Sequence, residues 1–389
     1  MIIRSVSPEE RPAVSLPLQQ YAFTASPGPG FPFDPRYHHE NAVLAAFDGE
    51  RALACATRIP MTQNVRGRVL AMAGVAGVAA APDARRGGHV RALVDRHLAD
   101  AVAEGFAVSA LYPFRTSFYE RFGYVSLPEP ARVTIDPASL TPLLRADLPG
   151  EVTWHPVADA YDDVRDLHTR LQRTTHGVAM RPAGNAAWVR EANESWAAVA
   201  RVAGEVVGAL VYKITGHHGE LAGGPLLAVD PHARALLLGF AARHVDQIDT
   251  VTLTPHPADR PELWSTDIAV TAAVRSTPTD VFAPMARVLS VPGLAGIDVG
   301  TGEVTVAVDD PLTGGTWRLR SDGGTLAVAA SDAEPEAVLT GHGLSALVYG
   351  VLDPAELPVR RFAPTLPAPV ADRLRALFPP VTPWLVEPF

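Results

Sequence analysis

The sequence is poor in two reactive residue types. Of its 33 basic residues only Lys213 is a lysine, and Cys55 is its single cysteine. A P-loop lysine is therefore excluded, and little scope is left for Schiff-base chemistry. One cysteine also excludes an internal disulfide and any cysteine-rich zinc site.

Long apolar runs and excess positive charge are absent as well. No stretch of 18 uninterrupted apolar residues occurs, and the opening residues MIIR do not begin a signal peptide. The 42 acidic residues outnumber the basic ones, for a net charge of −9. This balance argues against a nucleic-acid footprint and favours a cationic small substrate. We expect a soluble, reduced, cytoplasmic protein without nucleic-acid or membrane partners.

The chain contains enough apolar residues to form several hydrophobic cores. Its 389 residues, 47% of them hydrophobic, suggest two or three domains of about 150 residues each. Prolines and glycines cluster at residues 26–35, 128–142, 255–261 and 354–369. The first cluster is a loop near a site or a surface connector, and the next two are candidate domain boundaries. We predict three domains, at residues 1–148, 149–279 and 280–389.

Hydrophobic periodicity predicts a mixed α/β fold. In the middle region it predicts strands at residues 196–201, 206–214, 224–229 and 251–254 and a helix at 233–247. Beyond residue 279 the pattern becomes an alternating strand meander with helices at residues 344–352 and 368–377.

The strongest local pattern lies in the first region. Residues 69–81 form an apolar run that contains two glycines, as expected of a buried strand with close backbone approach. From Val90 the apolar positions follow a helical period until Gly105 ends it. A second strand at residues 106–112 and a helical turn at residues 116–122 come next.

The turn between this strand and helix has the composition of an anion site. Arg85, Arg86, Gly87 and Gly88 precede the helix, so free first-turn amides, the helix dipole and two guanidinium groups meet there. The glycines remove Cβ atoms that would obstruct a phosphate. It is neither a dinucleotide fingerprint nor a Walker loop. The alternative is an ordinary strand–helix turn with solvated arginines.

This pattern resembles the acyl-CoA-binding motif of GNAT acetyltransferases, R/Q-x-x-G-x-G/A, whose amides hold the CoA pyrophosphate. Here it reads RRGGHV at residues 85–90, with Val90 at the family's small-residue position, a mild departure. The resemblance implies acetyl-CoA as co-substrate. The residues it implies for the pyrophosphate are Arg85, Arg86, Gly87, Gly88, His89, Val90 and Arg91.

A second segment narrows the resemblance. Residues 118–124 read FYERFGY, similar to the Y-x-R-F-G-Y segment of enhanced intracellular survival (Eis) acetyltransferases. More weakly, residues 284–288 and 384–389 are similar to the opening and ending of a sterol-carrier-protein-like domain. The resemblance implies tandem GNAT domains with mixed central sheets, the second degenerate, followed by that third domain. It also implies hexameric assembly and broad acceptor pockets, some accepting aminoglycosides in relatives.

The resemblance assigns the acid and the base. Tyr119 would protonate the departing CoA thiolate, for which a phenol of pKa near 10 is adequate. Alternatively Tyr119 packs in the core; Tyr124 is its nearest rival and we interpret it as structural. The Phe389 α-carboxylate would assist amine deprotonation, although its usual pKa of about 3.3–3.7 calls for burial or a water relay. The alternative is that the tail docks for packing alone.

Further cofactor contacts follow from the same resemblance. The strand residues Val78, Ala79 and Ala80 would present backbone groups to the acetyl and pantetheine moieties, and one amide would polarise the thioester carbonyl. Phe114 and Arg115 lie where the family contacts CoA. Phe114 departs from the small or polar residues that are usual there, and Arg115 is either a phosphate ligand or a surface residue.

The amine pocket is assigned to residues 21–37 and the tail. Its candidate walls are Tyr21 and Phe23, and its candidate acids, each of which could instead be solvated, are Asp34, Glu40 and Glu387. No metal is expected, because adjacent histidines such as His38-His39 and His217-His218 do not face one site. Cys55 has apolar neighbours and is assigned to packing, and Ser345 fails G-x-S-x-G and is assigned to a helix.

We therefore predict an acetyl-CoA-dependent N-acetyltransferase that uses a direct ternary complex. Its acceptor would be a primary amine of a small cationic molecule, aminoglycoside-like or another polyamine. One alternative is a different acyl donor or a protein amine. The other is a carrier or sensor that binds CoA or lipid without turnover.

Overall fold

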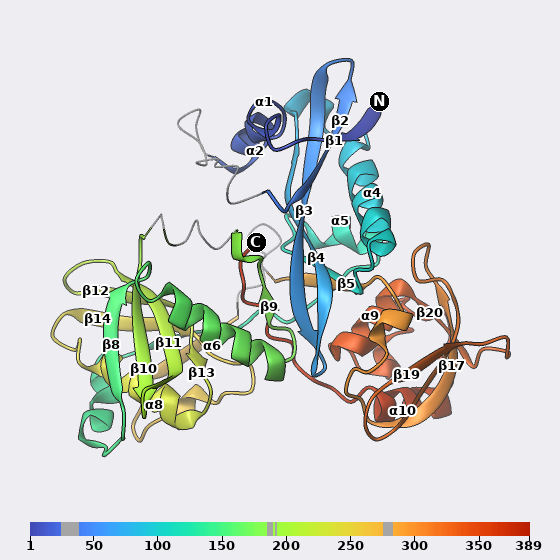
Figure 1. Ribbon diagram of the computed structural model, residues 1–389. Coiled ribbons are helices and arrows are strands. Elements are labelled where there is room, and N and C mark those ends of the chain that lie inside the picture. The colour runs from blue at the N-terminus through green and yellow to red at the C-terminus, as the bar shows by residue number, and fades with distance from the viewer. Residues whose placement is uncertain (25–38, 185–189, 191–192, 275–282) are drawn as a thin grey trace.

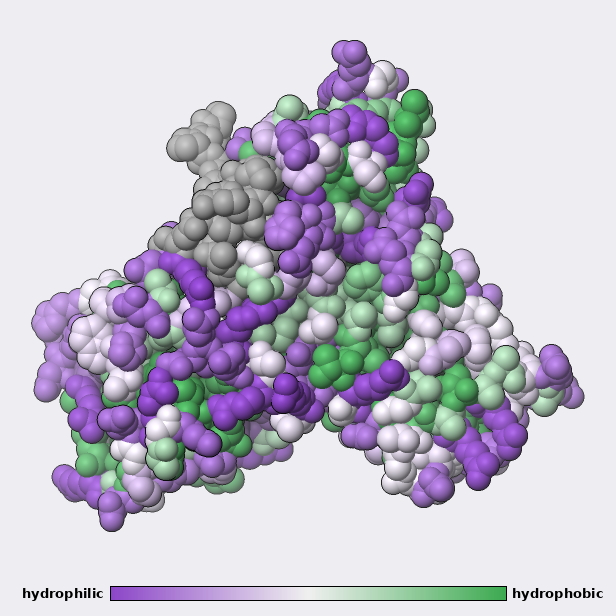
Figure 2. Space-filling view, in the orientation of Figure 1, coloured by the Kyte–Doolittle hydropathy of each residue, from purple (hydrophilic) through white to green (hydrophobic). Residues whose placement is uncertain are grey.

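The computed structural model describes residues 1–24, 39–184, 190, 193–274 and 283–389. They form three lobes, and the C-terminal end lies between them (Figure 1). The predicted loop at residues 26–35, with Asp34, and His38 lie outside the described residues. In Figure 2 hydrophobic residues gather toward the centre of this face, where the lobes meet, and hydrophilic residues dominate the outer tips.

The first lobe is built on an eight-stranded sheet in the order β1-β2-β3-β4-β5-β16-β6, with β9 paired to β3. Its strands are β1 (Ile2–Ser5), β2 (Ala42–Asp48), β3 (Arg51–Val65), β4 (Arg68–Ala80), β5 (Val108–Leu111), β6 (Val125–Ser126), β9 (Ala179–Met180) and β16 (Met285–Val288). Its helices are α1 (Arg11–Val14), α2 (Leu16–Phe23), α4 (His89–Ala103) and α5 (Thr116–Tyr119). The predicted strand–turn–helix–strand unit is confirmed as β4, α4 and β5.

The second lobe repeats this plan with an eight-stranded sheet in the order β15-β7-β14-β12-β11-β10-β8, with β13 paired to β11. Its strands are β7 (Arg132–Ile135), β8 (Glu151–Pro156), β10 (Trp196–Val202), β11 (Glu205–Ile214), β12 (Gly219–Pro225), β13 (Leu227–Ala228), β14 (Ile248–Thr254) and β15 (Val270–Ala273). Its main helices are α6 (Tyr161–Thr174) and α8 (Pro231–Ala242). Both large sheets are mixed, so the predicted mixed α/β fold is confirmed.

The third lobe contains a four-stranded sheet in the order β19-β18-β17-β20. Its strands are β17 (Thr301–Asp309), β18 (Gly315–Asp322), β19 (Ala327–Ala330) and β20 (Ala337–Thr340), and its helices are α9 (Gly341–Tyr349) and α10 (Ala368–Leu377). Val304, Val306 and Val308 alternate along β17 and are buried, as the meander pattern predicts. One hydrophobic core runs from the β3–β4 hairpin of the first lobe into this lobe.

Two predicted elements in the second lobe have wrong limits. The strand at residues 224–229 is two strands, β12 and β13, because Pro225 has no N–H to donate and interrupts the ladder with β11. The helix at residues 233–247 ends at Ala242, and the chain continues in tighter turns in which the amides of Arg243, His244, Val245 and Gln247 bond three residues back.

The two large sheets also exchange strands. Strand β7 leaves the first lobe and pairs with β14 and β15 in the second sheet. Strand β16 lies in the range predicted for the third domain, yet it pairs with β5 and β6 in the first sheet. The first sheet is therefore completed by a strand from a distant part of the chain.

Candidate active site

A cavity of about 1410 Å³ opens in the first lobe, between the end of β4, the start of α4, helix α2 and the C-terminal tail. Every residue assigned to catalysis or cofactor binding lies in its lining: Val78, Ala79, Ala80, Arg85, Arg86, Gly87, Gly88, His89, Val90, Arg91, Phe114, Arg115, Tyr119 and Phe389. The structure thus brings together residues that span more than 300 positions of sequence. The roles assigned to them remain predictions.

The cavity lies where strands β4 and β5 stop pairing with each other. Their parallel pairing ends at Val75 and Leu111, whereas β4 runs on to Ala80 with a partner only on its other side, in β3. The β3–β4 register also shifts in this stretch, where Gly77 has a φ of +56°. Such a bulge bends the strand away from its neighbour. The β5-facing backbone edge of residues 78–80 is consequently turned toward the cavity.

The turn before α4 has the features of an anion site. Gly88 is the residue that precedes the helix; it has a φ of +81° and no side chain caps the first-turn amides. Arg85 and Arg86 are exposed at this turn, and the Arg85 guanidinium lies 5.6 Å from the ring centre of Tyr21. Uncapped amides, the positive end of the helix dipole and two guanidinium groups are features that favour an anion at this turn.

Tyr119 both packs in the core and lines the cavity. Its ring contacts those of Phe114 and Phe118, with centroid separations of 5.5 and 5.0 Å. Within the described part of the chain its hydroxyl has no hydrogen-bond partner. Burial raises the pKa of Tyr119 above its usual value, so the phenol holds its proton at neutral pH.

Tyr124, the rival acid, is engaged elsewhere. It is fully buried and is not among the described residues that line the cavity. Its hydroxyl lies 2.6 Å from Ser109 Oγ, which itself donates to the Ala73 carbonyl. Burial raises the pKa of Tyr124 to about 12. This bonding supports its interpretation as a structural residue.

The C-terminal tail passes between the lobes into the cavity. The Trp384 amide donates to the His176 carbonyl over 2.8 Å, and the Tyr112 hydroxyl donates to the Glu387 carbonyl over 3.1 Å. The Phe389 ring meets the Tyr112 ring edge-on at 5.3 Å. It also fills the space beside Gly74, where a Cβ would lie 3.2 Å from the ring.

Among the lining residues that sequence reasoning missed, three carry groups that bear on the site. Tyr112 follows β5 and anchors the tail. Arg11 is buried, and its guanidinium donates to the Asn41 carbonyl over 2.6 Å. Arg181 follows β9, its Nε has no partner in the described part of the chain, and burial lowers its pKa. A single arginine at the start of a four-residue helix or just after a two-residue strand has no periodic signal, so nothing in the sequence marked Arg11 and Arg181 as neighbours of the cavity.

The candidate acceptor residues are dispersed. Tyr21 and Phe23 are exposed, and Phe23 lines the cavity. Glu40 lies beside His39 at 3.6 Å, away from the lining. Glu387 Oε2 lies 3.8 Å from His168 Nδ1 at the joint with α6, and it is likewise not among the described lining residues.

The remaining chemical candidates behave as packing or surface groups. Cys55 is buried, and burial raises its pKa to about 12. Ser345 lies in α9, where its hydroxyl donates to the Gly341 carbonyl over 2.7 Å. The His217 and His218 rings contact each other at a tilt of 51°, and His218 pairs with Asp249 at 3.2 Å. Among the described residues no group of three or more His, Cys, Asp or Glu side chains is arranged to hold a metal ion. No helix in the described ranges has the length and apolarity to cross a membrane.

Comparisons with known proteins assign both large lobes to one domain type. Residues 3–126 match the family described as "Acetyltransferase (GNAT) domain", and residues 171–288 match a second family with the same description. The sequence matches no curated protein.

Several solved structures resemble the whole chain. A probable N-acyltransferase from Enterococcus faecalis V583 has a TM-score of 0.83 and 19% identity, with 100% of this chain and 99% of that one covered. A GCN5-related N-acetyltransferase from Anabaena variabilis has a TM-score of 0.82 and 20% identity, with both chains fully covered. Eis1 from Mycobacterium abscessus has a TM-score of 0.78 and 20% identity, again with full coverage of both chains. At these identities the likeness shows a shared fold.

Proposed function

This chain is an acyltransferase with two GNAT acetyltransferase domains in tandem, and we propose that it transfers the acetyl group of acetyl-CoA to a primary amine in a direct ternary complex. The observation that carries the proposal is the shared cavity. An uncapped helix start with two arginines, the free edge of β4, a protonated phenol and the tail all open into it. Acetyl-CoA supplies the activated acyl group.

The residues present fit the cofactor. The amides of residues 88–91 and the guanidinium groups of Arg85 and Arg86 would hold the pyrophosphate. The backbone edge of residues 78–80 would bind the pantetheine arm, and one of its amides would polarise the thioester carbonyl. Phe114 and Arg115 also line the cavity, where Arg115 would add a phosphate contact.

Two groups would then handle the protons. As the new C–N bond forms and the C–S bond breaks, one proton leaves the amine and one reaches sulfur. Tyr119 would donate the proton to sulfur, and its raised pKa keeps it protonated for that task. The Phe389 α-carboxylate, directly or through a water, would accept the proton of the amine. Packing of the Phe389 ring between Tyr112 and Gly74 supports this placement.

The acceptor class divides into two candidates. A cationic, aminoglycoside-like or polyamine acceptor is supported by the net charge of −9 and by the Phe389 carboxylate. An amine that also carries a carboxylate is favoured by Arg181, whose buried guanidinium lines the cavity. The described lining residues include no Asp or Glu.

The wider expectations belong to the same proposal. We infer a third domain of the sterol-carrier-protein type, supported by the separate sheet, α9 and α10. The domain limits 1–148, 149–279 and 280–389, a homo-hexamer and a cytoplasmic location rest on the resemblance and on composition.

The test is an acetylation assay on the full chain. Release of CoA thiol is measured with aminoglycosides, polyamines and amino-acid amines, each with acetyl-CoA and with longer acyl-CoAs. We expect turnover with at least one amine, and deletion of Phe389 should reduce kcat by about 10-fold or more while the Kd for CoA stays constant. Tight CoA binding without turnover on any amine would instead identify a carrier or sensor.

A further inference from the structure

The residue proposed as the acid stands on a very short helical turn. Helix α5 has four residues and ends at Tyr119; the 3₁₀ turn η2 (Glu120–Phe122) continues it and Gly123 ends it with a φ of +80°. A turn this short has little stability of its own, and its last carbonyls need external donors. Because the Tyr119 hydroxyl has no described hydrogen-bond partner, ring packing and this backbone turn determine its position.

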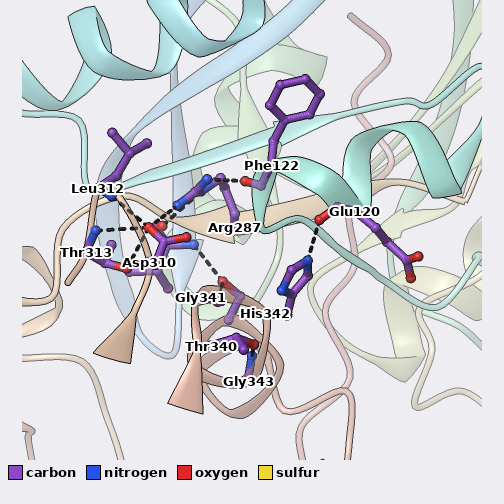
Figure 3. Close-up of polar contacts among 12 residues, drawn as sticks. Glu120, Phe122, Arg287, Asp310, Leu312, Thr313, Thr340, Gly341, His342 and Gly343 are labelled. Atoms are coloured by element: carbon purple, nitrogen blue, oxygen red, sulfur yellow. Dashed lines mark hydrogen bonds and ion pairs between the residues drawn. The ribbon is translucent and has the colours of Figure 1, made fainter. Parts of the chain in front are cut away.

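The donors for the turn come from outside the first lobe's own chain segment. Arg287, on strand β16, donates to the Phe122 carbonyl (Figure 3). The same guanidinium pairs with Asp310 of the third lobe at 2.9 Å, and the two side chains are only 3% and 7% exposed. Asp310 is held in turn by the Leu312 and Thr313 amides at 2.9 and 3.0 Å and by the Thr313 hydroxyl at 3.1 Å.

Charge stabilises this arrangement. Burial alone would raise the pKa of Asp310, but Arg287 and the three donors outweigh burial and hold it below its usual value. The Asp310 carboxylate is therefore ionised at neutral pH. A buried pair whose carboxylate also accepts two backbone amides and a hydroxyl resists displacement, because removal of one partner leaves an uncompensated charge.

The third lobe makes a second set of contacts with the same turn, at the residue that follows Tyr119. The His342 Nε2, at the start of α9, bonds the Glu120 carbonyl, and the His342 ring stacks on Phe362 with an interplanar angle of 10°. Arg360 of the third lobe pairs with the Glu120 carboxylate at 3.1 Å. Asp310 also packs closely against the start of α9, because a Cβ added at Gly341 would lie 2.3 Å from Asp310 Oδ2.

We propose that Arg287, Asp310 and His342 are positioning residues that fix the Tyr119 hydroxyl against the cavity, so that the third lobe controls the general acid as well as supplying the tail. The inference rests on the proposed function of Tyr119. Proton transfer depends steeply on geometry, and a displacement of about 1 Å can reduce a rate by about 100-fold. Removal of these contacts should therefore lower kcat and leave CoA binding intact.

The main variant is Asp310→Asn, which removes the charge and keeps the shape. We expect kcat to fall roughly 10-fold to 100-fold, with the Kd for CoA changed less than about twofold. The control is Asp259→Asn, which breaks the Arg234–Asp259 pair in the second lobe, at 2.8 Å. It should lower the melting temperature without lowering kcat. Equal losses of kcat in both variants would overturn the proposal.

Coupling to Tyr119 separates positioning from general loss of stability. In a Tyr119→Phe background, Asp310→Asn should change kcat less than about twofold, because the group it positions is gone. A full additional loss in that background would show another route and overturn the proposal. His342→Gln, which keeps a donor near the Glu120 carbonyl, should retain more activity than His342→Ala.

A readout without turnover keeps this test separate from the proposed function. With 3-fluorotyrosine at position 119, the ¹⁹F resonance should shift or broaden in Asp310→Asn and in His342→Ala and stay unchanged in Asp259→Asn. This result would hold even if no amine were acetylated, which would count against the proposed function alone. An unchanged resonance in both third-lobe variants would overturn the positioning role.

Discussion

In the first lobe helix α4 connects the parallel strands β4 and β5, and in the second lobe helix α8 connects the parallel strands β12 and β14. The helix starts differ. Gly88 precedes α4 and leaves the first-turn amides uncapped. Asp230 precedes α8, and its carboxylate accepts the Ala233 amide over 2.7 Å. The second lobe thus fills its own anion position with an internal carboxylate.

The loops that follow β5 in the first lobe and β14 in the second also differ, and again only the first lobe keeps the candidate functional residue. After β5 the chain forms the turn that carries Tyr119. After β14 it forms the short 3₁₀ turn η4 (Pro261–Leu263), and residues 255–274 contain no tyrosine. The second lobe's cavity, of about 760 Å³, is lined by the later part of α8 and not by its start. The two lobes therefore share a framework, and the second lacks counterparts of the residues that we propose for phosphate binding and proton transfer in the first.

Loss of the phenol is the largest change expected in the first lobe. Tyr119→Phe should lower kcat by about 100-fold or more, because the thiolate loses its proton donor, with the Kd for CoA unchanged. Since burial raises the pKa of Tyr119, the wild-type rate should not fall through loss of this proton at or below the usual tyrosine pKa. Steady-state kinetics from pH 6 to 10 measure both effects.

Tyr124→Phe is the matched control, because it removes a hydroxyl from the same region. Its bond to Ser109 is lost, so the free energy of unfolding should fall by about 1 kcal/mol. The rate should change little. If the Tyr124 variant lost more activity than the Tyr119 variant, the two roles would have to be exchanged.

Transplanting the second lobe's cap into the first tests the helix starts directly. Gly88→Asp places a carboxylate where the pyrophosphate would bind, and the Kd for CoA should rise by about 100-fold through repulsion and loss of free amides. Gly88→Asn is the control of equal shape without the charge, and it should weaken binding much less. Calorimetry with CoA measures both. Equal weakening by the two side chains would mean that shape, not charge, distinguishes the lobes.

The residues of this helix start were predictable because their signal is local. A continuous apolar run, two arginines, a glycine pair and a helical apolar period follow one another directly and specify β4, its turn and α4. The tail's docking and the role of Tyr119 came from the family resemblance. By contrast, strands β7 and β16 change lobes, and Arg181 reaches the cavity from residues far along the chain. Contacts between such distant segments leave no periodicity in the sequence.

The surroundings of Glu387 also depend on contacts between distant segments, which the sequence does not reveal. It is a candidate acceptor-binding residue, and the structure places its partly buried side chain at the joint between the tail and α6, near His168. Only the meeting of the lobes creates that environment. Burial raises the pKa of Glu387 to about 7, and Arg181 and Arg165 oppose the rise.

At this joint, the contribution of Glu387 to the free energy of unfolding should depend on pH, whereas that of an exposed surface carboxylate should not. The folded protein keeps a proton on Glu387 that the unfolded chain releases above about pH 4.3, so this stabilisation is present below that pH and lost as pH rises through about 7. Glu387→Gln should therefore be more stable than wild type at pH 8, by roughly 2–3 kcal/mol at most, and equal to it near pH 4. Denaturant unfolding at both pH values measures this. Glu40→Gln, at the exposed His39–Glu40 pair, should show no such trend, and a like trend there would refute the assignment to burial.

The smallest expected effect lies at the second lobe's own cap. Asp230→Ala removes the side-chain acceptor of the Ala233 amide, and the free energy of unfolding should fall by about 1 kcal/mol. Asp230→Asn, which keeps an acceptor oxygen, should lose less. Neither change supplies arginines or a phenol, so kcat should stay at the wild-type value and calorimetry should still find one CoA bound per chain. A second equivalent of CoA in the alanine variant would show that this single carboxylate closes the second site, and the two lobes would then differ by one residue in their capacity to bind the cofactor.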